Sequence, residues 1–200
     1  RHLVVREKRE ALAKFRIYSF ADASWTDVGF PEPVYEASAM ATPEWDAPAF
    51  RLSYQSMVTP PTVYDVSFAD GTLTLLKRTA VLGGYNADLY ATERRWATAR
   101  DGTRVPLSLF YRKGTKLDAK APCLLYAYGS YGFGMPATFS YSMVSLVDRG
   151  VIFVIAHVRG GNEPGEPWHD HGMLFEKKNT FFDFIDTARF LIDSTLTSPD

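Results

Sequence analysis

The chain has 200 residues, with 22 basic and 23 acidic side chains and a formal net charge of −1. This balance excludes the basic footprint typical of nucleic-acid binding and the polybasic anchor typical of a membrane surface. The longest purely apolar run, residues 151–156, is far shorter than the roughly 20 residues of a membrane-spanning helix. The single cysteine, Cys123, excludes an internal disulfide and favours a cytoplasmic protein with a buried, inert thiol.

The first 80 or so residues are typical of short strands separated by turns, because apolar and polar side chains alternate in several short runs. Asp70-Gly71 lies between two such runs and predicts a hairpin. Residues 21–48 have a weaker period. The pattern favours a sandwich, a barrel or a propeller without choosing among them. The expected strands are 2–6, 14–20, 50–57, 63–68 and 72–77.

A glycine-containing break at residues 81–86 ends this rhythm and marks the expected domain boundary. Two longer strands, 93–99 and 104–111, follow around Asp101-Gly102 and predict a second hairpin. Pro106 suggests that the second of these strands has one unpaired edge.

Beyond residue 120 the pattern changes to alternating strands and helices, which predicts a parallel sheet of the doubly wound type. The first strand is apolar throughout and is expected to be covered on both faces. Thr180 and Asp183 have the spacing of a capping box. The last helix carries an apolar stripe that includes Phe181, Phe184 and Ile185. The expected elements are strand 121–128, helix 138–149, strand 151–157 and helix 180–193.

Four short sequence motifs in this region carry a family resemblance. They are Tyr128-Gly129-Ser130-Tyr131-Gly132, Asp148-Arg149-Gly150, His157-Val158-Arg159-Gly160-Gly161 and Lys177-Lys178-Asn179-Thr180-Phe181. The chain resembles the serine peptidases of the prolyl oligopeptidase family, and within it the oligopeptidase B branch. The resemblance implies that residues 1–82 form the last blades of an all-β propeller. Residues 83–200 would then be the first part of an α/β-hydrolase peptidase domain, truncated before its nucleophile.

The catalytic serine of an α/β-hydrolase lies in a Gly-x-Ser-x-Gly turn, which this sequence lacks. Ser130 is flanked by glycines at the wrong spacing and is not expected to be the nucleophile. Because the triad residues of this fold follow one another along the chain as Ser, Asp and His, all three are expected beyond Asp200. Since the chain begins with Arg1 and ends in a turn-like segment, we expect an internal fragment that is inactive alone.

The resemblance assigns roles to residues of the first glycine loop. Tyr128 aligns with the tyrosine whose hydroxyl helps to bind the oxyanion, whereas the residues alone favour a core aromatic at the end of a strand. Tyr131 aligns with an aromatic that lines the substrate pocket. Pro136 and Thr138 stand where bacterial members of the branch carry two aspartates, so a strong preference for paired basic residues is in doubt.

The second glycine loop offers two further candidates. Arg159 is expected either to brace the loop by pairing with Glu163 or Glu166, or to contact substrate. His157 is expected to be a structural hydrogen-bonding residue.

The cluster His169-Asp170-His171 has poor spacing for a metal site, so no metal and no cofactor is expected.

The sequence thus predicts a serine endopeptidase fragment whose intact parent hydrolyses short peptides, with a preference for basic residues. The expected partners are short peptide substrates, with neither nucleic acid nor membrane. Three alternatives stay open: a prolyl-specific member of the same family, a non-catalytic propeller-containing binding module, and a metal-dependent hydrolase.

Overall fold

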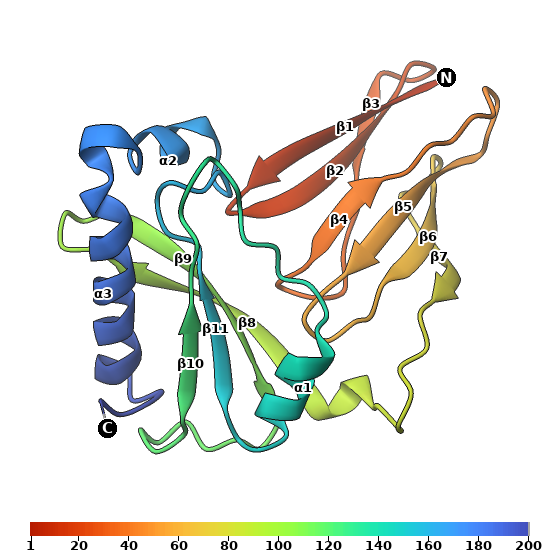
Figure 1. Ribbon diagram of the computed structural model, residues 1–200. Helices are drawn as coiled ribbons and strands as arrows, with labels where there is room; N and C mark the ends of the chain where they lie inside the picture. Colours follow the sequence, from red (N-terminus) through yellow and green to blue (C-terminus); the bar gives the residue numbers. More distant parts are fainter. Residues whose placement is uncertain (200) are drawn as a thin grey trace.

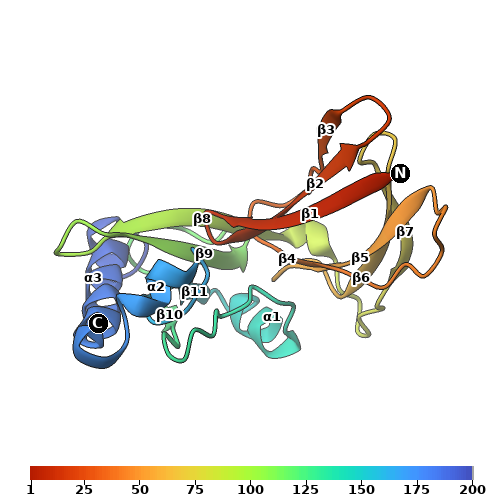
Figure 2. The ribbon, with the colours of Figure 1, turned by 90° about the horizontal axis from the view of Figure 1, so that it is seen from above.

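The computed structural model describes residues 1–199, which form two halves built on separate sheets (Figure 1). Viewed from above, the molecule is elongated, with the N-terminal sheets at one end and the longest helix at the other (Figure 2). The N-terminal half contains a three-stranded sheet in the order β1-β2-β3 and a four-stranded sheet in the order β4-β5-β6-β7. Its strands are β1 (His2–Arg9), β2 (Leu12–Ser19), β3 (Ser24–Asp27), β4 (Glu36–Ala39), β5 (Ala49–Gln55), β6 (Thr62–Ser67) and β7 (Leu73–Arg78).

All strand pairs in this half are antiparallel. The five expected strands are present, and the hairpin around Asp70-Gly71 joins β6 to β7. Strands β3 and β4 fall in the weakly periodic stretch and were not predicted. The two sheets share a core to which alternate residues such as Phe15, Ile17 and Leu52 contribute. Residues 1–199 contain these blade-like sheets but no closed propeller.

The C-terminal half contains a four-stranded sheet in the order β10-β11-β9-β8, together with the helices. Only β10 and β11 are parallel, whereas β8, β9 and β11 pair antiparallel. The prediction of a mainly parallel sheet is therefore wrong for the described residues, because the β8–β9 hairpin supplies half of the sheet. The elements are β8 (Tyr90–Thr98), β9 (Arg104–Arg112), β10 (Cys123–Tyr126), β11 (Ile152–Ala156), α1 (Tyr141–Val147), α2 (Glu166–Asp170) and α3 (Lys178–Asp193), with single 3₁₀ turns at Ala87–Leu89 and Leu174–Glu176.

Strand β9 is paired on both sides, so the expectation of an unpaired edge at Pro106 is wrong. Pro106 is tolerated because it lies next to the last pair of the β9–β11 ladder, which ends at Leu107 and Ala156. Its carbonyl still accepts a hydrogen bond from the His157 backbone N–H, at 3.0 Å.

Strand β10 is shorter than expected and lies at the edge of the sheet. Leu124 and Tyr126 are exposed, so the prediction of a strand covered on both faces is wrong in the described part of the chain. Cys123 lies on the half-buried face, and burial raises the pKa of its thiol to about 11. An edge strand leaves one row of backbone N–H and C=O groups without a ladder partner.

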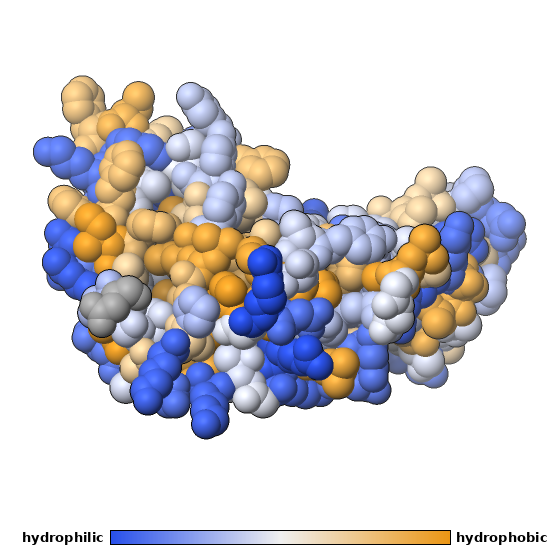
Figure 3. All heavy atoms as spheres, turned by 60° about the horizontal axis from the view of Figure 1, so that its bottom comes forward, coloured by the Kyte–Doolittle hydropathy of each residue, from blue (hydrophilic) through white to orange (hydrophobic). Residues whose placement is uncertain are grey.

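Helix α1 begins and ends inside the expected span 138–149, and Gly150 follows it with φ +87°. Helix α3 occupies the expected place, but the residues of the expected capping box have another role. Thr180 and Asp183 form no capping box; both are buried against the rest of the domain. Phe181, Phe184 and Ile185 in the first half of the apolar stripe face outward, and Phe181 is 61% exposed, whereas Leu191 near the end of the helix is buried. Figure 3 shows apolar atoms gathered in an open area of the half that contains α3, on the left of the view.

Candidate active site

Two loops lie side by side at the carboxyl ends of the parallel strands β10 and β11. Residues 127–132 follow β10, and residues 157–161 follow β11. The backbone N–H of Gly132 donates to the carbonyl of Gly160 at 3.0 Å and joins the loops. In open sheets, ligands bind outside the carboxyl ends of the parallel strands, so the fold marks these loops as the candidate site.

Glycine is required where the loops cross. Gly129 has φ +66°, and a Cβ there would lie 2.5 Å from side-chain carbons of both Val158 and Thr180. Gly160 has φ +97°, and a Cβ on it would overlap the carbonyl oxygen of Gly129. Both positions combine a left-handed backbone with a contact that leaves no room for a side chain. The close approach of the two loops therefore depends on glycine at positions 129 and 160.

Tyr128 lies between the end of β10 and Gly129, and its side chain is 44% exposed. Its ring packs edge-on against Phe133, with ring centroids 5.9 Å apart. Within residues 1–199 its hydroxyl has no hydrogen-bond partner, so the phenol is available as a donor. Tyr131 is 89% exposed at the tip of the loop and has φ +57°. The structure places both tyrosines on the candidate loop, and their roles stay predictions.

Lys177, which immediately precedes α3, joins the two loops to the helix. Its Nζ donates to the Gly129 carbonyl, to Ser130 Oγ at 2.8 Å and to Thr180 Oγ1 at 3.2 Å. Thr180 Oγ1 in turn donates to the Arg159 carbonyl at 2.6 Å. These roles were not predicted. The only signal in the sequence was the motif Lys177-Lys178-Asn179-Thr180-Phe181, which contains both Lys177 and Thr180.

Arg159 is 5% exposed and is held by two carboxylates. Its Nε and Nη2 donate to Asp183, with the shortest bond at 2.6 Å, and its Nη1 donates to Asp101 Oδ2 at 2.6 Å. Although burial opposes the shift, hydrogen bonds from Thr103 and Arg159 lower the pKa of Asp101 to about 2. Arg159 thus braces the loop, as one hypothesis held, but its partners are not Glu163 or Glu166. Substrate contact by Arg159 stays a prediction that this geometry disfavours.

His157 lies in a buried chain of polar groups. Ser108 Oγ is 2.6 Å from His157 Nε2, and Glu163 Oε1 is 3.1 Å from Nδ1. The order serine, histidine and carboxylate imitates a catalytic triad, but all three side chains are buried and substrate cannot reach them. Burial lowers the pKa of His157. Glu163 Oε1 also accepts a bond from the Met135 backbone at 2.9 Å, so this chain supports the loop beyond Gly132.

The cluster His169-Asp170-His171 does not form a set of metal ligands. In residues 1–199 no three or more His, Cys, Asp or Glu side chains are grouped to hold a metal ion. His169 Nδ1 instead lies 3.1 Å from the Gly160 carbonyl. Within the same residues no helix is long and apolar enough to cross a membrane.

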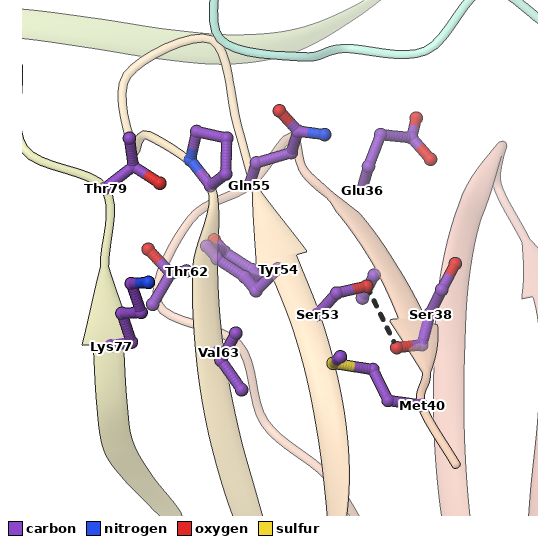
Figure 4. A pocket seen from close by; sticks show the side chains of 12 residues that line it. Glu36, Ser38, Met40, Ser53, Tyr54, Gln55, Thr62, Val63, Lys77 and Thr79 are labelled. Atoms are coloured by element: carbon purple, nitrogen blue, oxygen red, sulfur yellow. Dashed lines mark hydrogen bonds between the residues drawn. The ribbon is translucent and has the colours of Figure 1, made fainter.

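A pocket of about 310 Å³ lies on the β4–β7 sheet (Figure 4). Ser53 Oγ donates to the Ser38 carbonyl in its wall, at 3.2 Å. Tyr54 also lines it. It belongs to the N-terminal half, so it is no part of the loop site.

Comparisons with known proteins agree with this arrangement. The prolyl oligopeptidase N-terminal β-propeller domain matches residues 1–79, and the prolyl oligopeptidase family matches residues 137–200. Dipeptidyl aminopeptidase BI of Pseudoxanthomonas mexicana is 46% identical over 98% of this chain and 27% of its own length. Oligopeptidase B of Leishmania major superposes with a TM-score of 0.85 at 39% identity, over 99% of this chain and 29% of that one. Oligopeptidase B of Trypanosoma brucei superposes with a TM-score of 0.86 at 38% identity, over 98% of this chain and 29% of that one.

The chain spans less than a third of the length of these relatives. Two different parts of one family's architecture match it in the correct order, and together they include more than half of its residues. The chain belongs to the prolyl oligopeptidase family.

Proposed function

We propose that this chain is part of a serine peptidase that hydrolyses short peptides through an acyl-enzyme, and that Tyr128 helps to bind the oxyanion. The observation that carries the proposal is the exposed, unpartnered phenol of Tyr128 at the carboxyl end of β10. An oxyanion site needs a donor that is held rigidly and is not already paired. The Tyr128 hydroxyl is not already paired, and the close contacts around the adjacent Gly129 hold the backbone beside it rigidly.

The triad is expected in residues that follow Asp200 in the full-length protein. Two surfaces of this chain support that proposal. The free edge of β10 can pair with a further strand, and the exposed apolar stripe of α3 can pack against further structure. We therefore propose that the chain alone has no peptidase activity and low solubility, since open edges and apolar faces favour aggregation.

The direct test is Tyr128→Phe in the full-length protein. This change removes one hydroxyl and preserves the ring. Loss of one oxyanion donor lowers kcat by about 10²–10³-fold in comparable enzymes, so we expect a loss of about 100-fold with a small change in KM. A loss below about threefold would contradict the proposed role. A fluorogenic peptide ending in arginine provides the assay, and turnover by the isolated 200-residue chain would contradict its proposed inactivity.

The proposed preference for a basic residue before the cleaved bond comes from the sequence resemblance to the oligopeptidase B branch, to which two similar solved structures belong by name. Pro136 and Thr138 carry no charge, and we therefore propose that one basic residue is recognised rather than two. Matched peptides with Arg, Arg-Arg or Pro at the cleavage site test this. Equal or better turnover of the proline peptide would favour a prolyl-specific enzyme instead.

A second candidate function is removal of dipeptides from a free amino terminus, which the 46% identity to a dipeptidyl aminopeptidase favours. The two functions differ in what they need at the start of the substrate. An endopeptidase cleaves a peptide whose amino terminus is acylated, whereas a dipeptidyl aminopeptidase requires the free amine. Comparing kcat/KM for one peptide with and without an N-terminal blocking group separates them.

A further inference from the structure

The Nζ atom of Lys177 lies among three oxygen atoms from two different segments. They belong to the Gly129 carbonyl, the Ser130 hydroxyl and the Thr180 hydroxyl. An ammonium group has three N–H donors and no acceptor. All three donors have partners here, so Lys177 is a cross-link between the loop and the helix and not a base for Ser130.

The cross-link acts on the residue that follows Tyr128. Gly129 is held from several sides, by Lys177 at its carbonyl, by Val158 and Thr180 at its Cα, and by Gly160 across the crossing. The direction in which the chain leaves Tyr128 is set by this one peptide. The position of the Tyr128 side chain therefore depends on how firmly the Gly129 carbonyl is held.

Stability of α3 does not account for a lysine at this place. The Lys177 side chain makes no capping hydrogen bond at the start of α3, Lys178 is the first helical residue, and the first turn has no acidic residue. Positive charge at a helix N-terminus opposes the helix dipole. The ammonium group is partly buried, and this partial burial lowers the pKa of Lys177. Three hydrogen bonds from a charged donor offset these costs.

We infer that Lys177 is a positioning residue that holds the Tyr128 hydroxyl where the oxyanion forms. This inference rests on the proposed function of Tyr128. A donor in such a site must be held within about 0.5 Å of its productive position. Displacement by about 1 Å lowers rates by up to about 100-fold. Without the ammonium group, the Gly129 carbonyl and the Ser130 hydroxyl lose their hydrogen bonds from Lys177, and the Tyr128 phenol is held less firmly.

The experiment is Lys177→Met in the full-length protein, with Lys178→Met as the matched control. Both variants lose one positive charge at the start of α3, and Lys178 is exposed. We expect Lys177→Met to lower kcat by about tenfold and to leave KM within about threefold, because the change disturbs a contact made in the transition state. Lys178→Met should retain full activity. Unchanged kcat in a folded Lys177→Met protein would overturn the inference.

A double-mutant cycle with Tyr128→Phe separates positioning from general structural damage. If Lys177 acts through the Tyr128 hydroxyl, Lys177→Met should cost less than about twofold in the Tyr128→Phe background. An equal loss in both backgrounds would overturn the inference. If Tyr128→Phe lowers kcat but Lys177→Met does not, only this inference fails. If Tyr128→Phe has no effect, the proposed role of Tyr128 fails first, and this inference fails with it.

Lys177→Arg is the second variant, for use if the methionine variant does not fold. It retains the charge and several donors, although its planar fork fits three convergent acceptors less well. Its kcat should lie between those of the wild type and Lys177→Met, and its deficit should also disappear in the Tyr128→Phe background. A deficit that persists there contradicts the inference.

Discussion

Replacing Gly129 with alanine tests whether the crossing of the two loops determines the site. The new methyl group would lie 2.5 Å from carbons of Val158 and Thr180 and 3.0 Å from the Arg159 carbonyl oxygen. A left-handed backbone costs a residue other than glycine about 1–2 kcal/mol. Overpacking a well-filled region costs about 1–3 kcal/mol more. We expect Gly129→Ala to lower the free energy of unfolding by about 2–5 kcal/mol and to lower kcat, since Tyr128 immediately precedes it.

Gly150→Ala is the matched control. Gly150 also has a positive φ, +87°, but a Cβ there would meet nothing within 4 Å. Its replacement should cost only the backbone part, about 1–2 kcal/mol, and should leave kcat unchanged. Urea unfolding and peptidase assays of both variants in the full-length protein measure the difference. The reasoning is refuted if Gly129→Ala is no more destabilising than Gly150→Ala, because the contacts around Gly129 would then be free to relax.

Two further predictions concern buried charges. Arg159→Met leaves Asp183 buried without its partner and should destabilise the protein by about 3–5 kcal/mol. Arg189→Met removes an exposed arginine from Asp186, which Arg100 still binds, and should cost less than about 1 kcal/mol in the same urea titration. Similar costs for both would contradict the bracing role of Arg159. Burial lowers the pKa of His157 below its ordinary 6.5, so the unfolded chain binds a proton that the folded chain does not. The contribution of His157 to the free energy of unfolding should therefore be fully present above pH 6.5 and be lost as the pH falls below it. His157→Gln should flatten this part of a plot of melting temperature against pH. An unchanged plot would exclude His157 as the cause.

The local features of the candidate site could be predicted from the sequence because they depend on residue type and short spacing. The buried strand β11, the hairpins at Asp70-Gly71 and Asp101-Gly102, and the glycine turns after β10 and β11 all follow from patterns of a few residues. The place of Tyr128 at the end of a strand follows from the same pattern.

The partners of the site residues could not be predicted in this way. Arg159 was expected to pair with a carboxylate close in sequence, yet it pairs with Asp183 and Asp101, which are 24 and 58 residues away. The spacing of Thr180 and Asp183 indicated a cap, but their polar groups bind the second loop instead. Contacts of this kind arise only when a helix packs against the end of a sheet.

The sequence by itself determined most of the turns, strands and helices, though not β3 and β4, because turns, strand alternation and helical spacing depend on neighbouring residues. Only the tertiary structure decided which face of α3 is buried. Asp183 and Thr180 bind the Arg159 loop and face inward, whereas the apolar side chains of Phe181 and Ile185 face outward. A period of 3.6 residues shows that a helix has two faces. The Arg159 guanidinium and carbonyl on the neighbouring loop select the face that packs, because they bind Asp183 and Thr180.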